Sequence, residues 1–114
     1  MAFRRRNYEL EADLYKVPMP WLFKREMGEL ERTSYEDGEE RLKISFRGVK
    51  IPEGAIAEVA IDGTVVAELA VAGGRARQIL TTTENHSVPE VKDGQKVEIR
   101  FQGAALLAGV FKYD

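Results

Sequence analysis

The chain contains no cysteine, and it has one histidine, one tryptophan and four prolines among 114 residues. Without cysteine, disulfide scaffolds, thiolate metal sites and thiol catalysis are excluded. No apolar stretch approaches the roughly 20 residues that a membrane-spanning helix needs. The basic cluster at 4–6 is followed by acidic residues instead of the apolar run of a secretory signal. The sequence therefore predicts a cytoplasmic protein with no membrane partner.

A basic surplus is also missing, because the formal net charge is −2. Dedicated nucleic-acid binders usually carry a positive surplus, so no nucleic-acid partner is predicted. Residues 1–40 hold ten acidic against seven basic side chains, whereas the remainder is nearly balanced. The shift falls near Asp37-Gly38, which is a turn signal. We therefore predict an N-terminal arm over 1–38 and a β body over 39–114.

Two glycine-bracketed segments, 54–63 and 94–103, look like copies of one another. Their apolar and acidic positions coincide when they are aligned forty residues apart. Just before them, the triplet 51–53 (Ile-Pro-Glu) resembles 88–90 (Val-Pro-Glu). The pattern predicts one three-stranded unit used twice, over 39–72 and 75–112.

The body shows the two-residue period of half-buried strands, most clearly where Leu42, Ile44 and Phe46 alternate with polar residues. About six such strands, joined by Gly- and Pro-marked turns, indicate a mainly β, antiparallel fold. We predict a small barrel, with a two-sheet sandwich as the alternative. For the hairpin around Asp62-Gly63, a three-residue loop that pairs Val59 with Val65 keeps both apolar rows on one face.

The arm is harder to assign. Residues 8–17 alternate like a strand and also carry apolar residues at helical spacing, and the following prolines favour the extended form. After Pro20, the residues Phe23, Met27 and Leu30 lie on one side of a helix. The sequence therefore predicts one short helix in the arm.

No residue pattern matches a known catalytic or metal-binding signature. His86 is a lone histidine in a polar loop, and no nucleophile elbow, triad or metal-loop spacing accompanies it. We therefore predict no catalytic residue, no metal and no cofactor. Arg75 and Arg77 follow the Gly73-Gly74 break, where arginines can meet a phosphate or carboxylate. Together with His86 they are the candidate ligand-binding residues.

Apolar and aromatic residues give the strongest functional indication. The cluster Trp21-Leu22-Phe23 is of the kind that dominates interface energetics. The last segment, 104–111, is apolar on both faces and includes Leu106 and Val110. We therefore predict a non-enzymatic protein-interaction or self-association module, a homodimer included, that uses these residues. The alternative is a small-ligand-binding protein or enzyme with a pocket between the two repeats.

Overall fold

The computed structural model describes residues 5–18 and 25–114. These residues form nine strands and one short 3-10 helix: β1 (Arg6–Lys16), β2 (Glu26–Tyr35), β3 (Glu40–Phe46), β4 (Ile56–Ile61), β5 (Thr64–Ala70), β6 (Ala76–Thr81), η1 (Thr82–Glu84), β7 (Lys96–Phe101), β8 (Ala104–Val110) and β9 (Lys112–Tyr113). Within this described part, no helix has the length and hydrophobicity needed to cross a bilayer.

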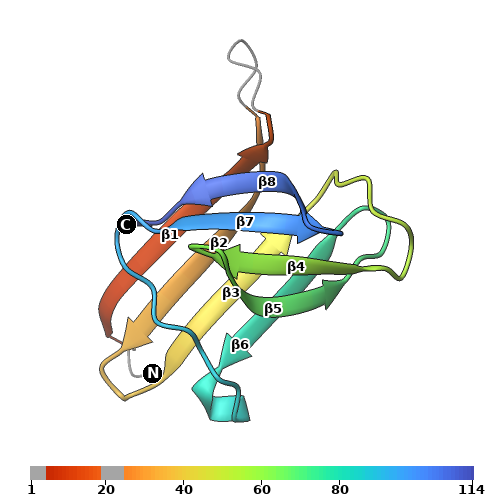
Figure 1. The fold of residues 1–114 in the computed structure, drawn as a ribbon. Coiled ribbons are helices and arrows are strands. Elements are labelled where there is room, and N and C mark those ends of the chain that lie inside the picture. Colours follow the sequence, from red (N-terminus) through yellow and green to blue (C-terminus); the bar gives the residue numbers. More distant parts are fainter. Residues whose placement is uncertain (1–4, 19–24) are drawn as a thin grey trace.

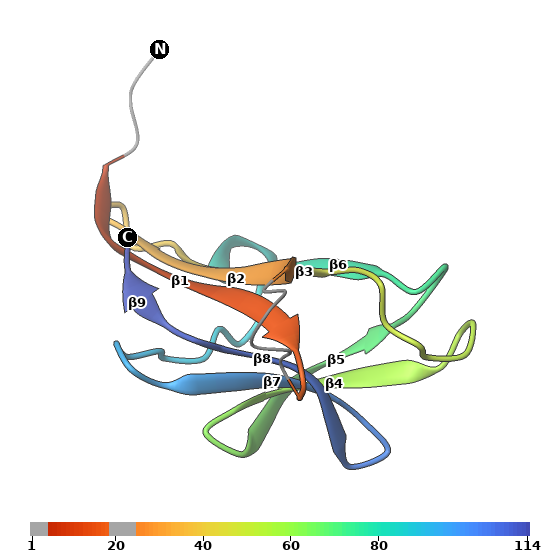
Figure 2. The ribbon, with the colours of Figure 1, turned by 90° about the horizontal axis from the view of Figure 1, so that it is seen from above.

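All strands belong to one antiparallel sheet with the order β5-β4-β7-β8-β1-β2-β3-β6, and β9 pairs with β1. The sheet curls into a nearly closed barrel of eight strands, so the predicted barrel is confirmed, although six strands were too few. Figure 2 shows that the barrel is flattened into two layers, β1-β2-β3-β6 and β8-β7-β4-β5. The layers are joined where β1 meets β8, and the sheet's two ends, β5 and β6, meet at the opposite side.

The core lies between the two layers and is filled by alternate residues of each strand. In β1 the inward-facing residues Leu10, Ala12 and Leu14 are at most 1% exposed, while the acidic residues between them face outward. The same alternation continues in β3 and in β7. Each fully buried large aliphatic side chain contributes about 1.5–3 kcal/mol, so this alternation fixes which face of each strand points inward.

The predicted helix is wrong over the residues that the structure describes. Residues 26–31 belong to β2, which pairs with β1 on one side and β3 on the other. Helical spacing of three apolar residues is a weak signal, and ladders on both sides outweigh it. Residues 20–24 of that prediction lie outside the described residues. The segment 1–38, predicted to be an arm, supplies β1 and β2 to the sheet.

The predicted three-residue loop between β4 and β5 is also wrong. Ile61 pairs with Thr64, so the turn has two residues, Asp62 and Gly63, with φ of 48° and 84° as in a type I′ turn. Val59 pairs with Ala67, because a β-bulge adds one residue to β5 before that point. The bulge returns the later apolar residues to the core and leaves Val65 42% exposed.

The β7–β8 hairpin has the same construction. Gln102 and Gly103 form a two-residue turn with φ of 51° and 81°, and a bulge adds Leu106 to β8. The third strand of each predicted unit does not continue the relation, because β3 and β6 pair with each other and the β1–β2 hairpin lies beside β8. A three-stranded unit used twice is therefore not confirmed.

Gly28 lies where the backbones of β2 and β3 leave no room for a Cβ atom, and its substitution tests this packing. A Cβ built there would lie 2.7 Å from Phe46 Cα and closer still to Ser45 O, both of which are backbone atoms that no rotamer change can move. We expect Gly28→Ala to lower the free energy of unfolding by about 3 kcal/mol, at the upper end for overpacking.

The control for this prediction is Gly38→Ala, in the turn after β2. Its φ is +95°, but a Cβ there meets no atom within 4 Å, so only backbone strain of about 1 kcal/mol is expected. Urea unfolding of the two variants measures the difference. Equal losses at both positions would contradict the close approach of β2 and β3.

Candidate functional site

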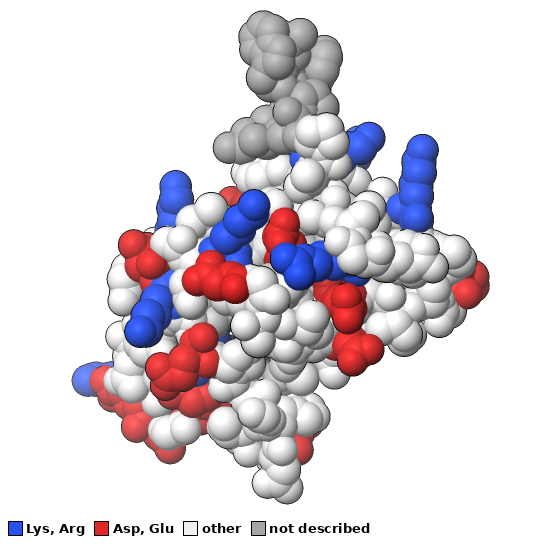
Figure 3. Space-filling view, viewed as in Figure 1, with Lys and Arg blue, Asp and Glu red and all other residues white. Residues whose placement is uncertain are grey.

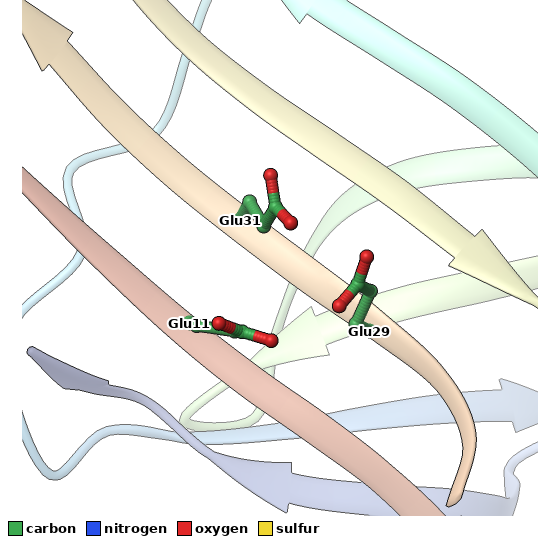
Figure 4. A group of neighbouring side chains, drawn as sticks. All are labelled: Glu11, Glu29 and Glu31. Atoms are coloured by element: carbon green, nitrogen blue, oxygen red, sulfur yellow. The ribbon is translucent and has the colours of Figure 1, made fainter. Parts of the chain in front are cut away.

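Acidic side chains cover the outer face of β1 and β2. Directly opposed across these strands are Glu11 with Glu31 and Asp13 with Glu29. In Glu11, Glu29 and Glu31 a carboxylate oxygen of each lies within 4.8 Å of the others. Figure 4 shows the three side chains on the same side of the two strands. Like charges directly opposite on neighbouring strands destabilise a sheet.

The cluster changes the acidity of its members. Partial burial raises the pKa of Glu11 to about 8, and a hydrogen bond with Glu29 and the charge of Asp13 add to the effect. Burial and Glu29 also raise the pKa of Glu31, although Lys43 on β3 opposes this. Glu11 therefore relieves the repulsion by holding a proton near neutral pH.

Carboxylate oxygens are the ligands that hard divalent cations prefer. Glu11, Glu29 and Glu31 are thus residues that could hold such an ion, as are Asp13, Glu26 and Glu29 on the same face. The described basic groups nearest to this acidic row in register are Lys43 on β3, opposite Glu31, and Lys112 on β9, opposite Glu11.

The two ends of the sheet do not complete their pairing. Ala72 and Arg75 form one antiparallel bridge directly after the Gly73-Gly74 turn, with N···O distances of 3.0 and 3.2 Å. Continuing this register would pair Ala70 with Arg77, but within the described residues no strand is paired with β6 on this side. The barrel therefore has an open seam between β5 and β6.

The hydrogen bonds at both ends of β6 show which backbone groups face the seam. Arg75 exchanges both of its backbone hydrogen bonds with Ala72, away from β3. At the other end, Thr81 N donates to His86 Nδ1 at 3.1 Å and Thr81 O accepts from His86 N at 3.2 Å, also away from β3. Because backbone groups alternate in direction along an antiparallel strand, those of Arg77 and Ile79 point into the seam.

A groove of about 510 Å³ lies at this point, where the ladder stops. Its walls include Arg47 from β3's end, Arg75 and Arg77 from the start of β6, and Ala70 from β5. No acidic side chain lines it, and among the described residues none of the three arginines forms an ion pair with a carboxylate. The structure therefore brings the predicted residues Arg75 and Arg77 together and adds Arg47.

His86, the third predicted ligand-binding residue, is not part of this groove. Its Nδ1 accepts the Thr81 N–H at the far end of β6, and its Nε2 is 4.0 Å from Glu84. Since Nδ1 is the acceptor, the proton of the neutral ring sits on Nε2. This arrangement holds the loop after η1 in place, which is a structural role.

Buried polar groups at that end of the barrel are also structural. Glu39 accepts hydrogen bonds from the hydroxyls of Thr81 and Thr83 and pairs with Arg41. Arg32, 1% exposed, donates to Pro89 O at 2.8 Å and thereby fastens the 85–95 loop across the end of the barrel. These hydrogen-bond partners all come from within the chain, and among the described residues Arg41 Nε alone is buried without one.

The predicted interaction residues are spread out. Trp21, Leu22 and Phe23 lie outside the described residues. Leu106 is the bulged residue of β8 and packs partly against the core. Val110 is 44% exposed in a depression of about 630 Å³ beside β1 and β9. On the face seen in Figure 3, formed by β8-β7-β4-β5, acidic and basic side chains are interspersed.

Comparison with known proteins found no match among protein-family models, curated proteins or solved structures. The site is therefore assigned from its own geometry.

Two features escaped the sequence analysis. The acidic row was missed because residues 26–31 were assigned to a helix, although Glu29 and Glu31 alternate like Glu9, Glu11 and Asp13. If residues 8–17 and 26–31 had both been assigned to strands of one hairpin, these acidic residues would have been predicted to lie opposite one another. No sequence pattern predicts the open seam between β5 and β6, because the seam depends on the distance between the two layers of the folded barrel.

The raised pKa of Glu11 predicts how stability depends on pH. Between its ordinary value of 4.5 and about 8, folded Glu11 keeps a proton that the unfolded chain has released. Rising pH in this range therefore lowers the free energy of unfolding. We expect Glu11→Gln to raise Tm most at pH 8 and above and to flatten the dependence, measured by calorimetry between pH 5 and 9. Glu90→Gln, in an exposed loop, is the control, and a Glu11→Gln curve parallel to the wild-type curve would contradict the prediction.

The seam predicts an alternating pattern of amide exchange along β6. Gln78 and Leu80 direct their N–H groups to β3 and should exchange slowly, whereas Arg77 and Ile79 should show little protection because no strand covers them. Residue-resolved hydrogen exchange by NMR measures this. Strong protection of Arg77 and Ile79 would mean that the barrel is closed in solution.

Proposed function

We propose that this chain is a non-enzymatic protein-interaction module that binds an extended segment of a partner protein by pairing it with the free side of β6. One observation carries the proposal: the ladder between β5 and β6 ends after the bridge at Ala72 and Arg75, so Arg77 and Ile79 present backbone donors and acceptors that no strand in the described part of the chain pairs.

An unpaired strand side is a template for another strand, and added strands are a recurring mode of peptide recognition. Backbone hydrogen bonds give such complexes affinity, and alternate side chains give them specificity. The seam offers both elements, because the groove beside Arg77 receives side chains next to the free backbone groups.

The positions of Arg75, Arg77 and His86 also favour this proposal over the alternative of a small-ligand pocket lined by all three. The arginines line the groove, while His86 is held at the other end of β6 by Thr81. A single small ligand that needs all three residues is therefore less well supported than an extended one. Self-association through the same seam remains the variant in which the partner is a second copy.

Strand addition predicts binding that depends on backbone groups. An octapeptide of alternating threonine and valine is the probe, titrated into 15N-labelled protein. We expect the amide signals of Arg77 and Ile79 to shift and these amides to become protected from exchange. The same peptide N-methylated at alternate backbone nitrogens should not bind, since it lacks the donors.

The matched variant is Ile79→Pro. Its N–H points into the seam, so proline removes a donor that β3 does not use, and edge positions tolerate proline. We expect this variant to fold and to lose the peptide, with Gln78→Pro as the control that damages the β3 ladder instead. Binding that survives both N-methylation and Ile79→Pro, or no shift along β6 at millimolar peptide, would overturn the proposal.

A further inference from the structure

The arginines that line the groove indicate the charge of the segment that binds there. Arg75 and Arg77 are exposed, and Arg47 is fixed by a hydrogen bond from its Nη2 to Glu26 O at 3.1 Å. None of them has a carboxylate partner among the described residues. The guanidinium of Arg47 thus reaches from the end of β3 to the start of β2, whereas Arg75 and Arg77 remain open to an anionic occupant of the groove. Each of these two offers planar donors that suit a carboxylate.

The pleat of the sheet fixes where such carboxylates must sit. Arg75 and Arg77 lie two residues apart and so share the outer face of β6, whereas Ala76 between them is buried on the inner face. A strand added to β6 has the same period. Its outward side chains would meet the arginines, and its inward side chains would lie beside Ala76 and Leu80 at the rim of the core.

Resting on the proposed function, we infer that the partner segment is an acidic strand, with Asp or Glu at alternate positions and apolar residues between them. Its acidic side chains pair with Arg75 and Arg77, and its backbone pairs with Arg77 and Ile79. The charged edge also discriminates, because arginines at a free strand side repel basic segments and hinder indiscriminate pairing.

Two octapeptides test this inference, one alternating glutamate with valine and the other lysine with valine. We expect the glutamate peptide to bind at least about tenfold more tightly at low salt, a preference that exposed ion pairs can provide together. Raising ionic strength to about 1 M should remove most of that preference, because the Debye length falls to about 3 Å.

Charge reversal provides the second arm. We expect Arg75→Glu combined with Arg77→Glu to bind the lysine peptide in preference to the glutamate peptide. The charge-matched control reverses Lys16 and Lys92, which are exposed and do not line the groove, and it should keep the original preference. If the reversal variant unfolds, Arg75→Gln combined with Arg77→Gln tests the same point by loss of the preference.

The outcomes separate the inference from the function beneath it. If both charged peptides and the neutral peptide bind equally, and charge reversal changes nothing, the inference fails while strand addition stands. If no peptide shifts the β6 amides, strand addition itself fails. If the protein dimerises in sedimentation without peptide and the Arg75→Glu, Arg77→Glu variant is monomeric, the occupant is a second copy and the acidic partner is overturned.

Discussion

The bridge between Ala72 and Arg75 is where this sheet begins to close on itself and stops. The Gly73-Gly74 turn brings β5 and β6 together, and it places them at the two ends of an eight-strand path. A barrel removes free strand sides only when that last ladder is completed. Because the two layers diverge beyond the bridge, no strand among the described residues pairs with the backbone groups of Arg77 and Ile79. The groove forms at the same place.

Local alternation made the barrel predictable. Leu42, Ile44 and Phe46 in β3 alternate with polar residues, and burial of one face then determines which side chains point inward and hence the pairing register. The bulges were not predictable in this way. With two-residue turns at Asp62-Gly63 and Gln102-Gly103, the apolar residues of the second strand of each hairpin would face away from the core. One bulged residue in β5 and one in β8 turn the later apolar residues back toward the core. A three-residue loop would also place both apolar rows on one face, so the sequence pattern alone does not distinguish a three-residue loop from a two-residue turn with a bulge.

The candidate site was predictable in part, for the same physical reason. Arg75 and Arg77 stood out because they follow a glycine turn and carry a fixed charge. Arg47 did not, because it joins them only through the pairing of β3 with β6, which is a contact between distant parts of the chain. His86 was grouped with the arginines because all three lie in or beside loops that join the two predicted units, yet the length of β6 separates them. Residues that are close in sequence are also close in space within a turn, but residues at the two ends of a strand are not.

Charge is divided across the outer face of the β1-β2-β3-β6 layer, and this division bears on the proposed acidic partner. Acids occupy β1 and β2, whereas the outward positions of β3 and β6 include Arg41, Lys43 and Arg77. Lys43 already opposes the charge of Glu31, so the two halves meet between β2 and β3. The partner strand that we propose would therefore be repelled from the half that holds Glu11 and attracted to the half that ends at the free side of β6. Complementary fields of this kind speed encounter and help to fix register. The proton on Glu11 near neutral pH is a consequence of concentrating acidic side chains on β1 and β2, away from the seam. The acidic residues that give this face its charge division therefore do not all ionise near neutral pH.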